Sequence, residues 1–293
     1  MHKKILTVFC GRQKFLEILF VYLDILLDLN IIDEVHLWDY TQNPNNGKID
    51  LKNKEYIKNA CLKNNRYYLK TPEKYFFKNS DGKTIRKKWS SYYNYYRDNS
   101  LDCDKIIKCD DDIVYIDINS FEKYIESICD DYFLYPNIVN NDVCAYWQQK
   151  YGVHDLFDYK VDYQSTSDAH TSTPLSNWSQ DKNKAFLIHD LFLKDPKSFI
   201  ISSKNLKFYG SRLSINMFGI TGAGWRKYLH NDLILGDESF VSCGSGAGNF
   251  IKLDSLVSHF SFGPQSNFSE QERILSMYKE LSLSEKIRLK NES

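Results

Sequence analysis

The 293-residue sequence predicts an α/β fold, a single domain with a mixed central sheet flanked by helices. Three observations predict this class. The chain opens with a strand–helix–strand pattern, which favours parallel strands joined by a crossover helix. A later apolar strand runs directly into three aspartates, as expected at the ligand-binding edge of an open sheet. Glycine and proline are few, at 13 and 6 residues, which argues against a turn-rich all-β chain.

The first 70 residues supply the opening pattern. KILTVF at 4–9 is β-branched and apolar and predicts a buried strand. Residues 13–30 carry apolar side chains at helical spacing and predict a helix. EVHLWD at 34–39 predicts the second strand, and residues 53–70 predict a helix followed by a short strand.

The middle of the chain leads to the acidic segment. TIRKKWSSYYNYYRDN at 84–99 predicts a helix with basic and aromatic faces. KIIK at 105–108 predicts a strand that ends at the aspartates, and residues 113–118 continue in an extended conformation. Residues 119–130 predict the next helix.

The second half of the chain is less regular. Residues 150–178 are polar and predict a loop. The sequence has no visible internal repeat or linker, which favours one domain. The expected strands are 133–138, 143–147 and 211–218, with an extended segment at 253–262; the expected helices are 181–194, a helix after the turn 222–225, and 268–290.

Composition narrows the partners and the compartment. The 38 basic and 38 acidic side chains give a formal net charge of +0, so nothing suggests nucleic acid or an anionic membrane as a partner. The apolar stretch 15–32 contains three acidic residues, so we expect no membrane span. Seven cysteines without a CxxC pair, and no visible secretory signal, predict free thiols in the cytoplasm.

The most informative feature is the run Asp110-Asp111-Asp112, which follows an apolar strand. Three adjacent carboxylates repel one another, and a divalent cation is the usual counter-charge. Oxygen ligands suit Mg²⁺ or Mn²⁺, and diphosphate oxygens can complete the coordination. A solvated acidic turn is the simpler alternative, but the apolar IVYIDI that follows argues against an exposed loop.

Two other functions fit the same residues. Asp110-x-Asp112-x-Val114 has the general shape of a phosphoaspartyl hydrolase motif, with Gly236-Asp237 as a second acidic element. Against that function, more than a hundred residues with their own strand–helix–strand unit precede the motif. The 21 Tyr, 18 Phe and 5 Trp either fill the core or form a stacking surface, so a non-catalytic carbohydrate- or Ca²⁺-binding module is the third possibility.

The phrases EVHLWDYTQN, IKCDDDIVYID and LVSHFSFGPQ carry a resemblance to a known family. Together with the early strand–helix–strand unit, they resemble the GT-A nucleotide-sugar glycosyltransferases, a Rossmann-type fold. Among these, the chain is similar to small enzymes of large DNA viruses, such as chlorovirus capsid-glycan transferases. The resemblance covers residues 1–265, with 1–118 as the nucleotide-sugar half and 119–265 as the acceptor half. Residues 266–293 are then a C-terminal helix packed on that domain.

The resemblance implies a reaction and its partners. The donor would be a nucleotide sugar, with UDP as the expected nucleotide, and the cofactor Mn²⁺ or Mg²⁺. The acceptor would be a glycan or glycoprotein, and the compartment the cytoplasm, which is that of the host if a virus encodes the chain. In an inverting enzyme one carboxylate acts as general base, and Asp237 in LGDES is the candidate, with Glu238 as the alternative. Capping of a helix is the structural alternative for Asp237.

The resemblance also implies roles for the remaining candidate residues. Asp39 would bond the uracil or the ribose. Trp225, Trp178 and Tyr163 either stack on the acceptor sugar or, as is more common for such residues, belong to the core. His259 would be an additional metal or diphosphate ligand, or else a core-edge histidine bonded to backbone. The expected nucleotide-binding residues are Thr7, Phe9, Gly11, Arg12, Asp39, Arg86, Lys87, Asp110 and Asp111; the expected metal ligands are Asp110, Asp112 and His259.

Overall fold

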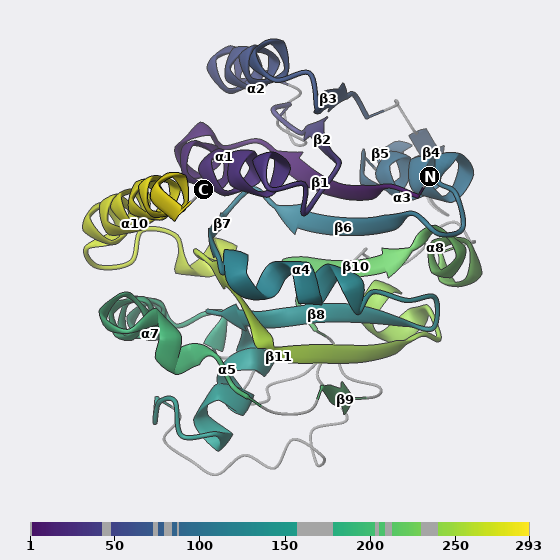
Figure 1. Cartoon of the computed structure of the whole chain (residues 1–293). Helices are drawn as coiled ribbons and strands as arrows, with labels where there is room; N and C mark the ends of the chain where they lie inside the picture. The colour runs from purple at the N-terminus through teal and green to yellow at the C-terminus, as the bar shows by residue number, and fades with distance from the viewer. Residues whose placement is uncertain are drawn as a thin grey trace.

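The computed structural model describes residues 2–42, 48–72, 76–78, 84–86, 88–156, 178–202, 205–208, 213–229 and 240–292. Within them, one nine-stranded sheet forms the centre of the molecule (Figure 1). Its strands run in the order β3 (Tyr67–Lys70), β2 (Glu34–Asp39), β1 (Lys4–Cys10), β6 (Lys105–Asp110), β10 (Met217–Thr221), β8 (Tyr132–Val139), β11 (Gly248–His259) and β7 (Ile113–Ile116), with β9 (Leu206–Phe208) paired to β11. A separate hairpin joins β4 (Phe76–Lys78) to β5 (Thr84–Arg86).

The sheet is mixed, but most of its strands point the same way. The pairs β3–β2, β2–β1, β1–β6 and β8–β11 are parallel, whereas β10, β7 and β9 run against their neighbours. From β1 the chain proceeds to β2 and β3 on one side, and β6 lies on the other side. Ligands of open α/β sheets bind where the strand order reverses in this way, at the carboxyl ends of the strands.

Helices cover both faces of this sheet. The described helices of seven or more residues are α1 (Gln13–Asp28), α2 (Leu51–Lys63), α3 (Lys88–Asn99), α4 (Ile118–Glu126), α5 (Asp142–Lys150), α7 (Lys182–Lys194), α8 (Gly222–Tyr228) and α10 (Gln271–Glu292). Side chains alternate along a strand, so two adjacent residues of β10 point to the helices on opposite faces of the sheet. Phe218 stacks on Trp225 of α8, whereas Gly219 lies under Tyr124 of α4.

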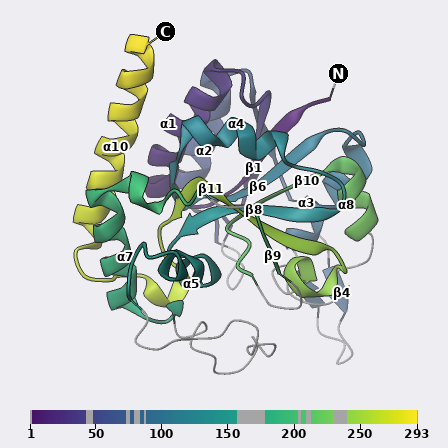
Figure 2. The ribbon, with the colours of Figure 1, turned by 60° about the horizontal axis from the view of Figure 1, so that its bottom comes forward.

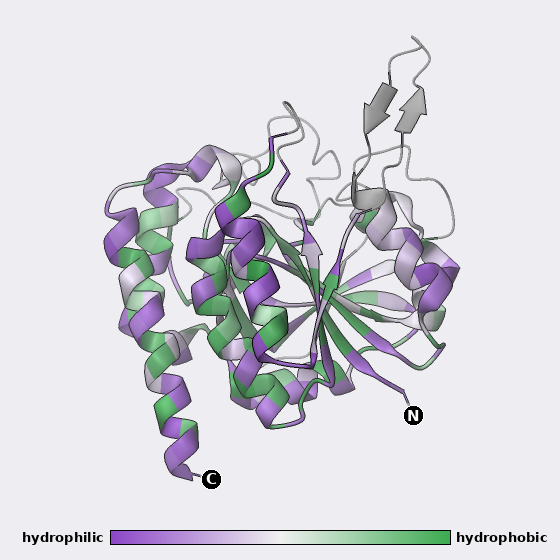
Figure 3. Ribbon diagram, turned by 90° about the horizontal axis from the view of Figure 1, so that it is seen from above, coloured by the Kyte–Doolittle hydropathy of each residue, from purple (hydrophilic) through white to green (hydrophobic). Residues whose placement is uncertain are grey.

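The C-terminal helix α10 packs against α1 and α7 beside the sheet (Figure 2). Its buried residues include Ile274, Leu275 and Tyr278, while the far end of the helix is largely exposed. In Figure 3 the central strands are mostly hydrophobic, and the helices alternate hydrophobic and hydrophilic residues. None of the helices described is long and apolar enough to cross a membrane, as expected from the acidic residues within α1.

Most of the expected elements are confirmed with shifted ends. The opening pattern is present as β1, α1 and β2, and the expected helix 181–194 is α7, whose N-cap Asp181 accepts from the amides of Asn183 and Lys184. The helix expected at 268–290 is α10, and the strand expected at 133–138 is β8.

Four expectations were wrong. The strand expected at 211–218 overlaps β10 only at Met217 and Phe218, and residues 213–216 form no strand. Residues 143–147 form α5 and not a strand, because the Asn141 side chain caps the helix at the Cys144 amide and a short apolar run does not distinguish the two states. Residues 84–86 form β5, so the helix expected over 84–99 begins only at Lys88. The residues expected as the turn 222–225 already belong to α8, which Thr221 caps by accepting from the Gly224 amide.

Candidate functional site

The candidate site lies at the carboxyl ends of β1 and β6, where the strand order reverses. Phe9 near the end of β1 is in register with Asp110 at the end of β6. The other two aspartates follow at once, since Asp111 and Asp112 form the turn between β6 and β7. The topology therefore places the acidic run in the crevice where an open sheet binds ligands.

Asp111 closes the turn that follows β1. Its Oδ2 accepts hydrogen bonds of 2.8 Å from the backbone amides of both Gly11 and Arg12. Its Oδ1 accepts from Arg12 Nε at 3.0 Å and also from the terminal nitrogen of that guanidinium. These bonds use both carboxylate oxygens of a side chain that is almost wholly buried. Asp111 therefore stabilises the turn after β1, whereas the resemblance implied that it contacts the nucleotide.

Arg12 joins this turn to the last aspartate. Its Nη2 lies 3.0 Å from Asp112 Oδ2, and its guanidinium carbon lies 4.9 Å from the centre of the Phe15 ring. Burial opposes the charge of the guanidinium, but Asp112 and Asp111 outweigh it and raise the pKa of Arg12. The side chain is nevertheless 48% exposed, so Arg12 remains accessible to a ligand.

Asp110 is held by a lysine that sequence reasoning missed. Lys108 Nζ lies 2.5 Å from Asp110 Oδ1, and Asn216 Nδ2 lies 3.4 Å from Asp110 Oδ2. Burial raises the pKa of Asp110, and the charge of Lys108 opposes that rise. A signal was present in KIIKCD, since residues two apart on a strand share a face and a lysine on a buried strand needs a partner.

Asp112 and His259 meet at the edge of the sheet. His259 ends β11 and is in register with Ile113, which brings its Nε2 to 3.4 Å from Asp112 Oδ2. Its Nδ1 donates to the Asn140 carbonyl at 3.2 Å, so Nε2 is the nitrogen that faces the carboxylate. Burial alone would lower the pKa of His259, but the Asp112 carboxylate raises it above its ordinary value. Burial opposes the charge of Asp112 in turn, yet His259 and Arg12 hold the pKa of its carboxyl well below the usual range.

Asn140 supports His259 from behind. It has φ of 57°, a left-handed conformation that Asn tolerates better than most residues. Its Nδ2 donates to the Phe260 carbonyl and to Gln265 Oε1, and its Oδ1 accepts from Trp178 Nε1, all at 3.0 Å. Since Asn140 also accepts the His259 bond, this network fixes the position of the imidazole.

The two described tryptophans of the acceptor prediction are core residues. Trp178 is fully buried in the Asn140 network, so it follows the core alternative and does not stack on an acceptor sugar. Trp225 is also fully buried, and its Nε1 donates to the Tyr93 carbonyl at 2.8 Å. Neither ring offers a face to solvent. Tyr163 lies outside the described residues.

The expected nucleotide-binding residues of β1 and β2 differ in accessibility. Thr7 is fully buried in the middle of β1, so its expected contact with a nucleotide was wrong. Phe9 is half-buried, and its ring meets Tyr40 and Tyr92 edge-on with centroids 4.9 and 4.5 Å away. Asp39 Oδ1 accepts from the amide and the hydroxyl of Thr41, at 3.0 and 2.6 Å, and so stabilises the end of β2.

Several expected residues cannot be placed. Arg86 ends β5, but its side chain lies outside the described residues. Lys87 and both base candidates, Asp237 and Glu238, also lie outside them. The structure thus brings together Gly11, Arg12, Asp110, Asp111, Asp112 and His259, with Phe9 beside them.

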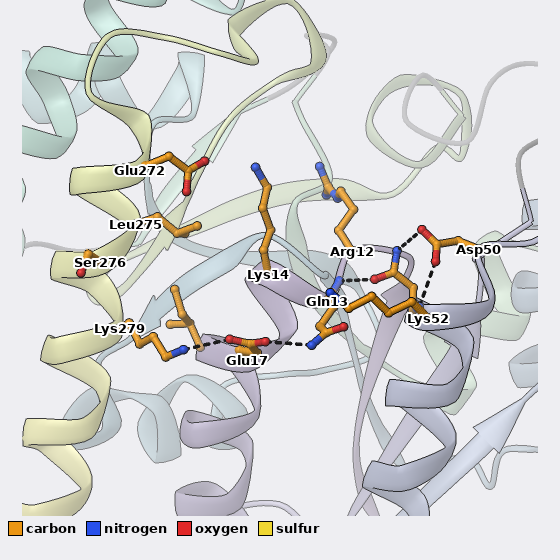
Figure 4. A pocket seen from close by; sticks show the side chains of 12 residues that line it. Arg12, Gln13, Lys14, Glu17, Asp50, Lys52, Glu272, Leu275, Ser276 and Lys279 are labelled. Carbon is orange, nitrogen blue, oxygen red and sulfur yellow. Dashed lines mark hydrogen bonds and ion pairs between the residues drawn. The ribbon is translucent and has the colours of Figure 1, made fainter.

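A polar pocket of 610 Å³ adjoins the site (Figure 4). It lies between the first turns of α1 and α2 and the side of α10, and Arg12 belongs to both the pocket and the acidic run. Hydrogen bonds join the helices that line it: Glu17 accepts from Gln13 and Lys279, and the Gln13 backbone amide donates to Asn53 Oδ1.

The donor types at the site suit a divalent cation. Carboxylates suit Mg²⁺ and Mn²⁺, and an imidazole favours Mn²⁺. Asp112 and His259 direct an oxygen and a nitrogen towards each other at 3.4 Å. Across the described part of the chain no group of three acidic, histidine or cysteine side chains is arranged to hold an ion. Asp112 and His259 supply two donor atoms of suitable type, and Asp110, which bonds Lys108, could supply a third only by leaving that lysine.

No protein-family model and no curated protein matches this sequence.

Proposed function

We propose that the protein is a metal-dependent glycosyltransferase that moves a sugar from a nucleotide-sugar donor to a hydroxyl group of a glycan or glycoprotein. UDP is the nucleotide we expect, and the cytoplasm the compartment. The observation that carries the proposal is the Asp112–His259 pair, which lies beside Asp110 at the reversal point of the sheet. This crevice is where open α/β sheets bind nucleotides.

The charges around the crevice suit a diphosphate leaving group. Asp112 and His259 would hold a Mn²⁺ or Mg²⁺ ion, with Asp110 as the third candidate ligand. Such an ion, when bound, would neutralise the negative charge that develops on the leaving diphosphate. Arg12 is half exposed and paired with Asp112, so its guanidinium can turn to a diphosphate oxygen and add a second positive charge.

The other chemical step is removal of a proton from the acceptor hydroxyl. We assign it to Asp237, with Glu238 as the alternative, as the resemblance implies for an inverting enzyme. The half-buried ring of Phe9, at the end of β1 beside Asp110, suits a stacking contact with the nucleotide base.

A screen of sugar nucleotides tests the proposal. The purified protein is incubated with Mn²⁺ and each of a set of UDP-, GDP- and CMP-sugars, and slow release of the nucleotide is measured. We expect hydrolysis of one donor that stops with EDTA, and thermal stabilisation by the corresponding nucleotide with Mn²⁺. Asp112→Asn should abolish both effects. Asp131→Asn is the matched control, because Asp131 pairs with Lys227 away from the acidic run.

The same experiment separates the alternatives. Absence of stabilisation by every nucleoside diphosphate with Mn²⁺ would contradict the proposal. Release of phosphate from a generic phosphomonoester would favour a phosphoaspartyl hydrolase with Asp110 as nucleophile. Glycan binding without hydrolysis of any sugar nucleotide would favour a non-catalytic binding module. Loss of transfer in Asp237→Ala, with nucleotide binding retained, would assign the base.

A further inference from the structure

Lys108 is a fully buried lysine in the middle of the sheet, with a relative exposure of 1%. It lies on β6 in register with Thr7, two residues before Asp110 and on the same face. Lysine is almost never buried to this extent without a partner, because removing its charge from water is costly. A lysine in this position therefore needs an explanation in the structure around it.

The ammonium group of Lys108 has three partners. It donates to Asp110 Oδ1 at 2.5 Å and to the carbonyl of Ile215, and it lies 5.1 Å from the centre of the Phe9 ring. An ammonium has three donors, and a cation near an aromatic ring is attracted to its face. Lys108 thus connects Asp110, the segment just before β10, and the half-buried ring at the end of β1.

The remaining oxygen of Asp110 is held by the same segment. Asn216 Nδ2 lies 3.4 Å from Asp110 Oδ2, and the Asp110 amide donates to the Asn216 carbonyl at 2.9 Å. Asn216 is in turn held by Asn141, whose Nδ2 lies 3.1 Å from Asn216 Oδ1. Both carboxylate oxygens of Asp110 therefore have protein partners, and neither partner is exposed.

Each aspartate of the acidic run has a cationic partner of its own, and Arg12 reaches two of them. Asp110 faces Lys108, Asp111 faces Arg12, and Asp112 faces His259 with Arg12 as a second neighbour. Lys108 lies in the middle of β6 and is 1% exposed, so a ligand cannot displace it by simple competition at the surface, as it could the half-exposed Arg12. The charge of Asp110 is then compensated from inside the sheet, while its side chain, at 26%, is the most exposed of the three aspartates; those of Asp111 and Asp112 are 6% and 3% exposed.

We propose that Lys108 is a positioning residue of the donor site, which fixes the Asp110 carboxylate and the Phe9 ring for the nucleotide and leaves the cation to Asp112 and His259. This inference rests on the proposed function and deepens it, because it divides the work between the two aspartates. Asp110 then serves as an oriented hydrogen-bond acceptor for the nucleotide, not as a charge for the metal.

A purely structural lysine would behave differently under substitution. If Lys108 only tied β6 to the segment before β10, its loss would weaken every ligand in proportion to the loss of stability. A positioning lysine has opposite effects on the two ligands. Without Lys108 the charge of Asp110 is uncompensated, so Mn²⁺ should bind at least as tightly as before. The nucleotide should bind less well, because Asp110 and Phe9 are no longer held.

The experiment uses Lys108→Met and Lys108→Arg in the full-length protein. Affinity for Mn²⁺ alone, affinity for UDP with Mn²⁺, and KM and kcat for hydrolysis of the donor found in the screen are measured for each. For Lys108→Met we expect at least a tenfold weaker UDP affinity, a KM raised by a similar factor, and Mn²⁺ affinity equal to or tighter than that of the parent. Lys108→Arg, which keeps the charge, should recover part of the UDP affinity.

Two further variants serve as control and rescue. Lys105→Met removes a lysine from the other end of β6, where it bonds the carbonyls of Ile125 and Glu126, and should leave both affinities within about twofold. If Lys108→Met does not fold, the double variant Lys108→Met/Asp110→Asn removes the uncompensated charge. It should recover thermal stability but not the affinity for UDP.

The outcomes separate the inference from the function on which it rests. If the parent protein binds no nucleoside diphosphate with Mn²⁺, the proposed function fails. If the parent binds UDP and Lys108→Met binds it equally well, the inference alone is overturned. It is also overturned if Lys108→Met weakens Mn²⁺ and UDP by the same factor. A loss of UDP affinity with Mn²⁺ affinity retained supports it.

Discussion

His259 Nε2 lies 3.4 Å from Asp112 Oδ2, and each of these side chains is only 3% exposed. The two residues are more than a hundred positions apart in the chain, yet β11 pairs with β7 so that they meet directly after the acidic turn. The imidazole is oriented by the Asn140 carbonyl on its other side. Such a bond to the second ring nitrogen is what orients a metal-ligating histidine.

Substitution of His259 by Gln should weaken Mn²⁺ binding at least tenfold, since it removes one of the two proposed ligands, whose side chains already face each other. The metal-free protein should also lose stability, because buried Asp112 then keeps Arg12 as its remaining cationic partner. Calorimetric titration with Mn²⁺ measures the first effect, and thermal unfolding in EDTA the second. His2→Gln, at an exposed position, is the control. Unchanged Mn²⁺ affinity in His259→Gln would remove His259 from the metal site.

Asp111→Asn should show that Asp111 stabilises the turn after β1 and does not bind the metal. The asparagine loses the charge that Arg12 faces and one of the oxygens that accept from the β1–α1 turn. We expect a loss of about 2 kcal/mol in the free energy of unfolding, because the ion pair is half exposed and only its buried hydrogen bonds count fully. Urea unfolding measures it.

Mn²⁺ binding should differ between Asp111→Asn and Asp112→Asn. Asp111→Asn should retain Mn²⁺ binding within about threefold once measured at a temperature where it is fully folded, whereas Asp112→Asn should lose it. If Asp111→Asn abolishes Mn²⁺ binding at full foldedness, Asp111 is a ligand and the turn is not its main task.

The sequence predicted the opening β–α–β unit and the acidic run correctly, because both depend on local pattern. Apolar spacing determines α1, and the aspartates follow a strand whose burial is evident from KIIK. The partners of these aspartates could not be predicted, since they arrive from distant segments. Asn216 comes from the segment immediately before β10, and His259 from the end of β11.

Local pattern also failed where two states share one composition. VCAYW at 143–147 is short, apolar and aromatic, which fits a buried strand as well as a buried helix. Its N-cap decides between them, because Asn141 Oδ1 accepts from the Cys144 amide. The aromatic excess was similarly ambiguous. Tyr92, Tyr93, Tyr96 and Trp225 prove to be core, packed ring against ring between α3 and α8.

Gly222→Ala should be severely destabilising, because α8 begins against the loop before β6. A Cβ at Gly222 would lie 2.0 Å from the Leu101 carbonyl oxygen, which is backbone and cannot rotate away. We expect a loss of about 3 kcal/mol in the free energy of unfolding, within the upper range for overpacking. Gly263→Ala is the matched control, since nothing lies within 4 Å of its Cβ, and it should change stability by less than about 0.5 kcal/mol. Equal stability of the two variants would show that α8 can shift away from Leu101.

The stability of the protein should fall as the pH drops below about 6.5, and His189 should account for part of the fall. His189 is fully buried, and its two ring nitrogens bond Tyr278 Oη at 2.8 Å and the Phe260 carbonyl at 2.7 Å. Burial lowers its pKa to about 4, and burial does the same for His36 and His154. The unfolded chain therefore binds more protons than the folded protein between pH 6.5 and 4, so stability increases with pH across that window.

Each such histidine contributes up to about 3 kcal/mol to this dependence when the full window is crossed. His189→Gln removes one titrating group while its amide can donate to the Phe260 carbonyl and accept from Tyr278. The free energy of unfolding in urea, measured from pH 7 to pH 5 in EDTA, should therefore vary less steeply with pH in His189→Gln, by a difference that approaches one proton. His2→Gln, at an exposed position, should keep the slope of the parent. If the slopes of His189→Gln and the parent coincide, His189 is not held neutral by burial, and the loss of stability in acid must come from the other histidines and the carboxylates.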